Sequence, residues 1–326
     1  MVPFSVLDLS PITDGSTAAV SFRHSLDLAQ HVERWGYKRY WIAEHHNMPG
    51  IASAATSVVM SHIAGGTKTI RVGAGGIMLP NHAPLVVAEQ FGTLESLFPG
   101  RIDLGLGRAP GGDHATARAL RRTLHSDPDA FPHDVLELLS YFHPEDGQLV
   151  RAVPGSGLNI PIWILGSSLF GAQVAALMGL PFAFASHFAA AQMMPAIAIY
   201  RDRFQPSGMS DTPRVMLGVN VVAADTDDEA KWLATSGRQA FANLRRGMPT
   251  TLPPPNKEFE KEVVPFRGIR LEEVQSVSMV GSVDTVRADL NDFITRTGAD
   301  ELIVVSHIYD HQARLRSYEL LAKMSL

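Results

Sequence analysis

The sharpest chemical feature of the sequence is the run Glu44-His45-His46, because imidazole titrates near neutral pH and can move protons. The run follows a short apolar segment, 39–43, that is predicted to be a strand. Neighbouring side chains at a strand end point in different directions, so at most one ring is expected to face a common site. In the alternative interpretation, both histidines cap buried polar groups. A metal site is disfavoured, since spacing of the His-x-Glu-x-x-His kind is absent.

A second group of residues has the chemistry of an anion site. Gly166-Ser167-Ser168 links a predicted strand to a predicted helix, where unpaired amides and the helix dipole attract negative charge. Arg108 follows another predicted strand and offers the fork-shaped donors that suit a phosphate, and Arg118 follows one helical segment later. The alternative is that the serines only cap the helix, which is the more common role at this position.

The glycine pair Gly75-Gly76 interrupts the otherwise well-packed segment 72–79. Two glycines in a strand indicate either unusual backbone angles or the close approach of the backbone to a flat ligand. A simple bulge explains them equally well, and the sequence alone does not separate the two interpretations.

These residues need a framework that brings strand ends together. Eight short apolar runs alternate with helical patterns, and most are continuously apolar, as in parallel strands buried on both faces. One helix is predicted to begin at Ala83-Pro84 and to end at Pro99-Gly100. The pattern predicts a single (β/α)₈ barrel over residues 1–326, in which chemistry gathers at the carboxyl ends of the strands. The predicted strands are 4–9, 39–43, 70–74, 102–106, 162–165, 182–185, 215–222 and 302–305.

Three predicted strand ends carry histidine, in Glu44-His45-His46, Ser186-His187-Phe188 and Ser306-His307, and a fourth carries Arg108. All four are expected to meet at one mouth of the barrel. Between the seventh and eighth strands, residues 225–281 form an insertion longer than one helix requires. Within it, the segment from about 249 to 275 begins with a proline-rich run and is predicted to be a mobile lid; a plain solvated insertion is the alternative.

Composition limits the classes of function. Lys+Arg 28 against Asp+Glu 33 gives a net charge of −5, so nothing global attracts nucleic acid or an anionic membrane. Cys 0 excludes disulfides, thiolate metal sites, iron–sulfur clusters and cysteine nucleophiles. The N-terminus has no secretory pattern, and no apolar run has transmembrane length, so a cytoplasmic protein is expected. No Gly-x-Ser-x-Gly motif supports a serine hydrolase.

Several long motifs occur in a fixed order along nearly the whole chain, at 43–47, 70–80, 82–90, 99–108, 163–168 and 279–282. With these motifs the sequence resembles the bacterial luciferase-like flavin monooxygenase superfamily. The resemblance implies a (β/α)₈ barrel that binds FMN as FMNH₂ and activates O₂ as a flavin C4a-(hydro)peroxide, to oxygenate a small organic substrate. Because no nicotinamide fingerprint is evident, a separate flavin reductase is the expected source of FMNH₂. The alternatives are an F420-dependent oxidoreductase on the same barrel and a non-catalytic flavin-binding protein.

The resemblance also implies roles for particular residues. His45 matches the catalytic acid or base beside the flavin, and His187 takes a position that packs near the flavin ring. Gly75 and Gly76 fall where the family has a non-prolyl cis peptide against the isoalloxazine. Gly107 stands where luciferase itself has a reactive cysteine, so the chemistry of that thiol is absent here.

For the phosphate of the flavin, the resemblance implies binding by Arg108, Arg118 and the loop Gly166-Ser167-Ser168. The segment between the two arginines is shorter than in luciferase, which weakens the match at Arg118. Relatives dimerise through their second and third helices. A homodimer is therefore expected, with the small-residue stretch 51–57 in the predicted second helix.

Overall fold

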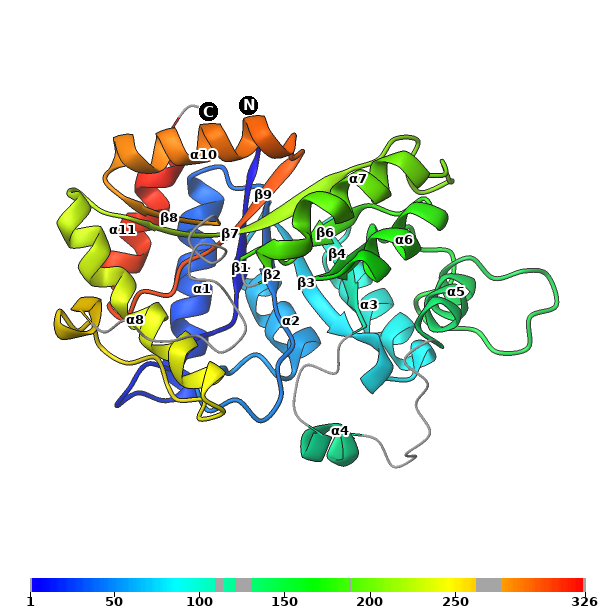
Figure 1. Ribbon diagram of the computed structural model, residues 1–326. Coiled ribbons are helices and arrows are strands. Elements are labelled where there is room, and N and C mark those ends of the chain that lie inside the picture. Colours follow the sequence, from blue (N-terminus) through cyan, green and yellow to red (C-terminus); the bar gives the residue numbers. More distant parts are fainter. Residues whose placement is uncertain (1, 109–113, 121–129, 188, 262–276, 325–326) are drawn as a thin grey trace.

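The computed structural model describes residues 2–108, 114–120, 130–187, 189–261 and 277–324. Eight parallel strands close into a barrel, since each strand pairs with the next and β6 also pairs with β7. The predicted barrel is therefore confirmed (Figure 1). Its strands, in order around the barrel, are β1 (Phe4–Asp8), β2 (Arg39–Ile42), β3 (Arg71–Met78), β4 (Ile102–Gly107), β5 (Ile162–Gly166), β6 (Phe182–Phe184), β7 (Val215–Ala223) and β9 (Glu301–Val305).

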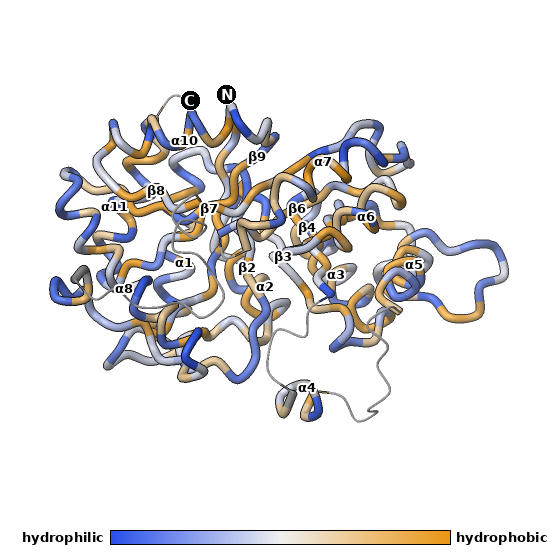
Figure 2. The backbone as a smooth tube through the Cα atoms, in the orientation of Figure 1, coloured by the Kyte–Doolittle hydropathy of each residue, from blue (hydrophilic) through white to orange (hydrophobic). Residues whose placement is uncertain are grey.

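Helices follow the strands and cover the outside of the barrel (Figure 1). The hydropathy of the backbone shows the reason, because apolar residues gather on the strands and on the helix faces toward them (Figure 2). The helices are α1 (Ala18–Arg34), α2 (Thr56–Gly66), α3 (Pro84–Leu97), α4 (His114–Leu120), α5 (Phe131–Phe142), α6 (Leu169–Leu177), α7 (Met193–Arg203), α8 (Asp227–Arg245), α10 (Val283–Thr297) and α11 (His311–Ala322).

The inside of the barrel is a packed core rather than a channel. Trp41 and Trp163 meet edge to face across it, with ring centres 5.7 Å apart. Toward the amino-terminal ends of the strands, Arg39 bonds to Asp103 and to Glu301, each at 2.7 Å, so buried ion pairs close that end. The other, carboxyl-terminal end is therefore the one left for a ligand.

A ninth strand, β8 (Ser278–Gly281), was not expected. It pairs in parallel with the last four residues of β7, Asn220–Ala223, whereas β6 pairs only with Val215–Leu217. Because β7 is nine residues long, its end extends past β6 and can accept another strand. Four residues are too few to show a period in the sequence, so only the pairing reveals the strand.

Most strand boundaries differ from the sequence prediction by one residue, and two differences are larger. β3 does not end at 74 but continues through Gly75 and Gly76 to Met78, with a shift of register against β4. Helix α2 begins at Thr56, so most of the small-residue stretch 51–57 precedes it. The side chain of Ser53 bonds to the backbone oxygen of Ala43 at 2.6 Å, which holds this stretch as a turn.

The predicted insertion begins with α8 and continues into the proline-rich run. That run is attached to the barrel, because Leu252 is buried and its amide bonds to the oxygen of Ile12 at 2.8 Å. The oxygen of Pro254 accepts a bond from Gln239 of α8 at 3.0 Å. Residues 249–256 of the predicted lid thus contact the barrel and α8, and 262–275 lies outside the described residues.

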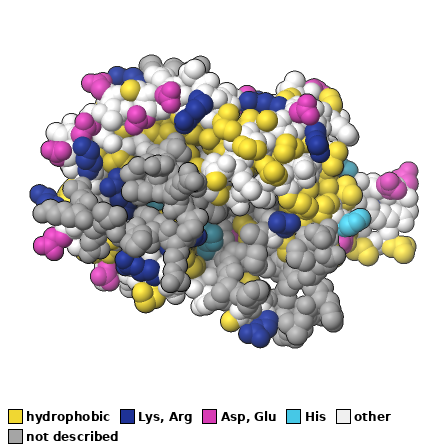
Figure 3. All heavy atoms as spheres, viewed as in Figure 1, with side chains coloured by type: hydrophobic (Ala, Val, Ile, Leu, Met, Phe, Trp, Pro, Cys, Tyr) yellow, Lys and Arg dark blue, Asp and Glu magenta, His cyan; other side chains and the backbone are white. Residues whose placement is uncertain are grey.

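Within the described ranges, none of the helices has the length and hydropathy needed to cross a membrane. On the face drawn in Figure 3, acidic and basic side chains are interspersed, and apolar side chains gather over α6 and α7.

Candidate functional site

Three histidines meet at the carboxyl-terminal mouth of the barrel. His45 comes two residues after Ala43, and His307 comes two residues after Val305; both preceding residues belong to the cluster inside the barrel. Side chains along a strand alternate between its two faces, so His45 and His307 continue the inward-facing row. His187 follows β6, and its pKa depends on both other rings, which places the three imidazoles close together.

The environment keeps two of these rings uncharged at neutral pH. Burial lowers the pKa of His187 to about 3, with smaller contributions from His307 and His45. Burial also lowers the pKa of His307 to about 4, together with the charge of Arg314. Neutral imidazoles offer one donor and one acceptor each, so these two rings are polar without a positive charge of their own. Gly218 of β7 makes room for this arrangement, because a Cβ there would overlap Nδ1 of His187.

The glycine pair lies in β3, which pairs with β2, the strand that precedes His45. The Gly75–Gly76 peptide bond is cis, as the resemblance implied. A Cβ on Gly76 would lie 2.6 Å from the oxygen of Gly105, and one on Gly75 would lie 2.7 Å from Cδ1 of Leu7. Neither position therefore has space for a side chain, because the side chain of Leu7 and the backbone of β4 occupy it.

Arg108, directly after β4, reaches the first turn of α6, the helix that Ser167 and Ser168 precede. The guanidinium of Arg108 lies over the ring of Phe170 in the first turn of α6, 4.2 Å from its centre. Ser168 is the N-cap residue of α6, but its side chain makes no capping hydrogen bond. Ser167, beside it, is exposed, and Gly166 ends β5. The interpretation of Ser168 as a simple side-chain cap is thus not supported, and this helix start keeps donors for an anion.

Arg118 does not join this group. It is an exposed residue of α4, which stands apart from the strands and the other helices (Figure 1). No described hydrogen bond or ion pair links Arg118 to Arg108 or to the start of α6. The residues 109–113 between β4 and α4 lie outside the described residues.

The structure separates the two adjacent histidines as the alternation of side chains requires. His46 does not continue the inward row; its Nε2 bonds to the buried carboxylate of Glu44 at 2.8 Å. The interpretation as a partner of buried polar groups therefore holds for His46. Among the described residues, no group of three or more histidine and acidic side chains could hold a metal ion.

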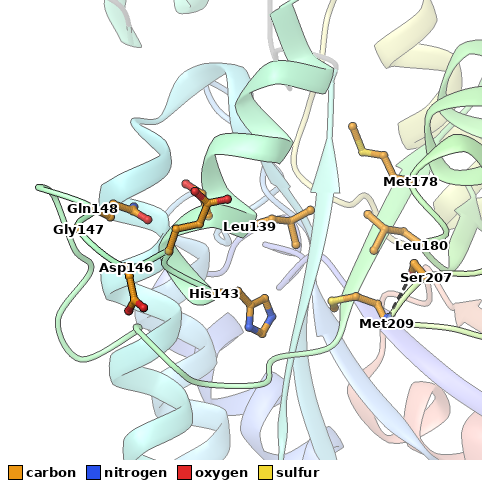
Figure 4. A pocket seen from close by; sticks show the side chains of 11 residues that line it. Leu139, His143, Asp146, Gly147, Gln148, Met178, Leu180, Ser207 and Met209 are labelled. Carbon is orange, nitrogen blue, oxygen red and sulfur yellow. Dashed lines mark hydrogen bonds between the residues drawn. The ribbon is translucent and has the colours of Figure 1, made fainter.

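A cavity of about 790 Å³ lies elsewhere, between the end of α5 and the segments that lead into β6 and β7 (Figure 4). Leu139, Met178, Leu180 and Met209 line it, with His143 at its side. These segments precede the strands, so the cavity is at the amino-terminal end of the barrel, away from the three histidines.

Comparison with known proteins agrees with this arrangement. The family model described as luciferase-like monooxygenase matches residues 2–301. The chain belongs to the luciferase-like monooxygenase family. The predictions of family and of enzymatic activity are therefore confirmed.

Two relatives of this luciferase-like monooxygenase span almost the whole chain. It is 54% identical to the protein YvbT of Bacillus subtilis (strain 168) and 52% identical to a luciferase-like monooxygenase of Escherichia coli (strain K12). Each alignment covers 98% of this chain, with 95% of the first relative and 96% of the second. Among solved structures, apo-MsnO8 is 37% identical, with a TM-score of 0.92 over 99% of this chain and 98% of that one.

More distant structures share the fold and differ in cofactor. The oxygenating constituent of 3,6-diketocamphane monooxygenase from Pseudomonas putida, solved with FMN, is 21% identical with a TM-score of 0.73 over 99% of this chain and 97% of that one. An F420-dependent secondary alcohol dehydrogenase is 13% identical with a TM-score of 0.74 over 99% of both chains. The fold thus serves both cofactors.

The list of predicted site residues omits one residue and one contact of this site. His307 was placed at the mouth but was not among the predicted site residues; its place in the row that includes Ile303 and Val305 is the signal that could have found it. The contact between Phe170 and Arg108 has no local signal, because it joins residues from two separate strand–helix units.

Proposed function

We propose that this luciferase-like monooxygenase binds FMNH₂ and uses it with O₂ to oxygenate a small organic substrate, and that a separate flavin reductase supplies the FMNH₂. The observation that carries the proposal is the contact of Arg108 with Phe170 at the start of α6. It supports a grip for a terminal phosphate within the same mouth that holds His45 and the Gly75–Gly76 backbone.

The residues fit this cofactor in kind. Arg108, Ser167, Ser168 and the first amides of α6 would hold the phosphate, since fork-shaped donors and a helix start both favour an oxyanion. The cis backbone of Gly75–Gly76 would pack against the flat ring of the flavin. Reduced FMN, when bound, supplies the electrons that activate O₂.

The histidines would transfer protons or form hydrogen bonds, and would not supply a positive charge. His45 would hold or move a proton at the reacting atoms. His187 has a pKa of about 3 and stays neutral, so it would contribute hydrogen bonding and packing beside the ring. His187 and His307, which stay neutral, bring no charge of their own to the mouth, and this suits an uncharged organic substrate.

Binding and oxygen consumption test this function. Quenching of flavin fluorescence measures the affinity for FMN, and the same titration with F420 tests the alternative cofactor. With a flavin reductase and excess O₂, we expect FMN-dependent oxygenation of a substrate from a panel of small organic compounds. Binding of F420 with no binding of FMN would overturn the proposal in favour of hydride transfer without oxygen.

We also propose that two chains associate through α2 and α3. Both helices carry apolar side chains that face solvent: Val58 is 68% exposed, Leu97 is 60% exposed and Val86 is 43% exposed. Burying such a surface against a symmetry-related copy would form an isologous interface.

A further inference from the structure

Glu44, directly after β2, has a buried carboxylate that the proposed function does not use. Its Oε1 accepts a hydrogen bond from Nε2 of His46 at 2.8 Å, and Nε2 of His82 lies 3.0 Å from both oxygens. The amide of Met78 donates to Oε2 at 2.9 Å, and Nδ2 of Asn81 lies 3.4 Å from Oε1. Burial raises the pKa of Glu44, but the bonds and charge of these donors, His82 foremost, hold it below its usual range.

These donors come from the two segments that leave neighbouring strands. His45 lies between Glu44 and His46, and these two neighbours are joined by a hydrogen bond between their side chains. Met78, on the other side of the carboxylate, is two residues beyond the Gly75–Gly76 peptide. Glu44 therefore fixes the end of β2 relative to the end of β3, and His45 relative to the glycine backbone.

Met78, which donates to Glu44, also packs against the end of β4. Sδ and Cε of Met78 each lie 2.8 Å from the place where a Cβ on Gly107 would stand. Gly107 directly precedes Arg108, the residue that contacts Phe170. A shift of Met78 would thus displace Gly107, and with it the backbone of Arg108.

Glu44 itself does not face the inside of the barrel. Ala43 belongs to the inward-facing cluster, and the next side chain along the strand points to the opposite face. Any effect of Glu44 on a bound ligand must therefore pass through the backbone and through its neighbours.

We propose that Glu44 is a positioning residue of this site, whose carboxylate sets His45 and the Gly75–Gly76 backbone in a fixed relation to the same ligand. This inference rests on the proposed flavin site. Preorganised groups bind and react better than groups that must be ordered by the ligand, and a misplacement of about 1 Å can cost about 100-fold.

Glu33 provides a matched control. Its Oε1 accepts bonds from the amides of Lys68, Thr69 and Ile70 at 2.8, 2.6 and 2.9 Å. Like Glu44, it is a carboxylate with several donors and a lowered pKa, to which the backbone bonds contribute. Glu33 belongs to α1, however, and its donors directly precede β3, at the end of the strand away from the mouth. Loss of its charge should affect stability without affecting the ligand.

The experiment compares Glu44→Gln with Glu33→Gln in the full-length protein. Flavin fluorescence gives the Kd for FMN, thermal unfolding gives Tm, and ¹H–¹⁵N spectra of the ligand-free protein report the His45 ring, assigned by its loss in His45→Asn. We expect Glu44→Gln to weaken FMN binding about 10- to 100-fold and to move or broaden the His45 signal. Glu33→Gln should lower Tm, keep Kd within about twofold and leave the His45 signal in place. Glu44→Asp, which keeps the charge, should recover part of the affinity.

The proposal is overturned if Glu44→Gln keeps the affinity and the His45 signal of the wild type, or if both variants lose affinity in proportion to their loss of Tm. If Glu44→Gln does not fold, His82→Leu removes one donor and leaves those of His46 and Met78; a weakened Kd and a moved His45 signal support the proposal, and unchanged values overturn it. If the wild type does not bind FMN, the proposed function fails, and the ligand-free His45 signal still decides whether Glu44 positions the ring.

Discussion

The guanidinium carbon of Arg108 stands 4.2 Å from the centre of the Phe170 ring. Arg108 directly follows β4, and Phe170 lies in α6, the helix that follows the next strand, β5. A planar cation over an aromatic face gains attraction and is held in a restricted orientation. The contact thus presents the arginine beside the first amides of α6, where an anion is most favoured.

Replacement of Arg108 should weaken binding of the FMN phosphate and leave binding of the flavin ring unchanged. We expect Arg108→Lys to weaken FMN binding about 10- to 100-fold, because the fork-shaped donors and the stacking are both lost. Affinity for riboflavin, which has no phosphate, should change by less than about threefold. Equal losses for both ligands in fluorescence titrations would refute a phosphate grip at Arg108.

Arg118→Ala, measured in parallel, tests the role that the resemblance implied for an arginine on the separate helix α4. We expect little change in the Kd for FMN.

His45→Asn should separate catalysis from binding. Loss of a proton-transfer group typically costs about 10²- to 10⁴-fold in rate, whereas the FMN affinity should stay within about threefold. The measurement is product formation per FMNH₂ consumed, beside a fluorescence titration. Unchanged product formation would show that His45 is not the acid or base.

Gly76→Ala tests the close approach of β3 to β4. The new Cβ would lie 2.6 Å from the oxygen of Gly105, so the backbone must move. We expect a loss of about 1–3 kcal/mol in the free energy of unfolding and weaker FMN binding. Gly208→Ala is the control, because no atom lies within 4 Å of its Cβ position. Urea unfolding that gave the same change for both variants would contradict this account.

Stability should fall on acidification before the carboxylates titrate. His187 and His307 have folded-state pKa values of about 3 and about 4, below the ordinary 6.5, so below pH 6.5 the unfolded state binds more protons than the folded state. Below pH 6.5 the loss caused by each histidine steepens, and it approaches about 1.4 kcal/mol per pH unit near pH 5.5. The stability is fully present above pH 6.5.

Urea titrations at several pH values measure this slope. His187→Gln should reduce it by the contribution of one histidine. His45, His307, Arg314 and Asp8 contribute to the pKa values of the pair, and all four are unchanged in this variant. A slope identical to that of the wild type would show that His187 is not held neutral by the fold.

The proposed interface predicts that substitutions in α2 and α3 lower the mass of the protein in solution. Val58→Asp and Leu97→Asp place charges on the exposed apolar faces of α2 and α3. If these faces join two chains, light scattering should give the mass of a dimer for the wild type and of a monomer for the double variant. A dimer that resists both substitutions would place the interface elsewhere.

Much of this protein is determined by local sequence. Continuous apolar runs and the helix signals between them predicted the eight barrel strands, because the period of the side chains and the residues that begin or end a helix act over a few positions. The same reasoning placed His45, His187 and Arg108 at one mouth, since the carboxyl ends of parallel strands must meet there.

Tertiary structure decided what depends on partners far apart in the chain. β8 exists because β7 extends past β6. The proline-rich run is fixed because Leu252 meets Ile12, about 240 positions away in the chain. Glu44 collects donors from the segments after two strands, and only closure of the barrel brings those segments together. Sequence determines which groups are present and on which face of a strand they lie; the contacts that set their charge and orientation form only when distant segments pack and exclude water.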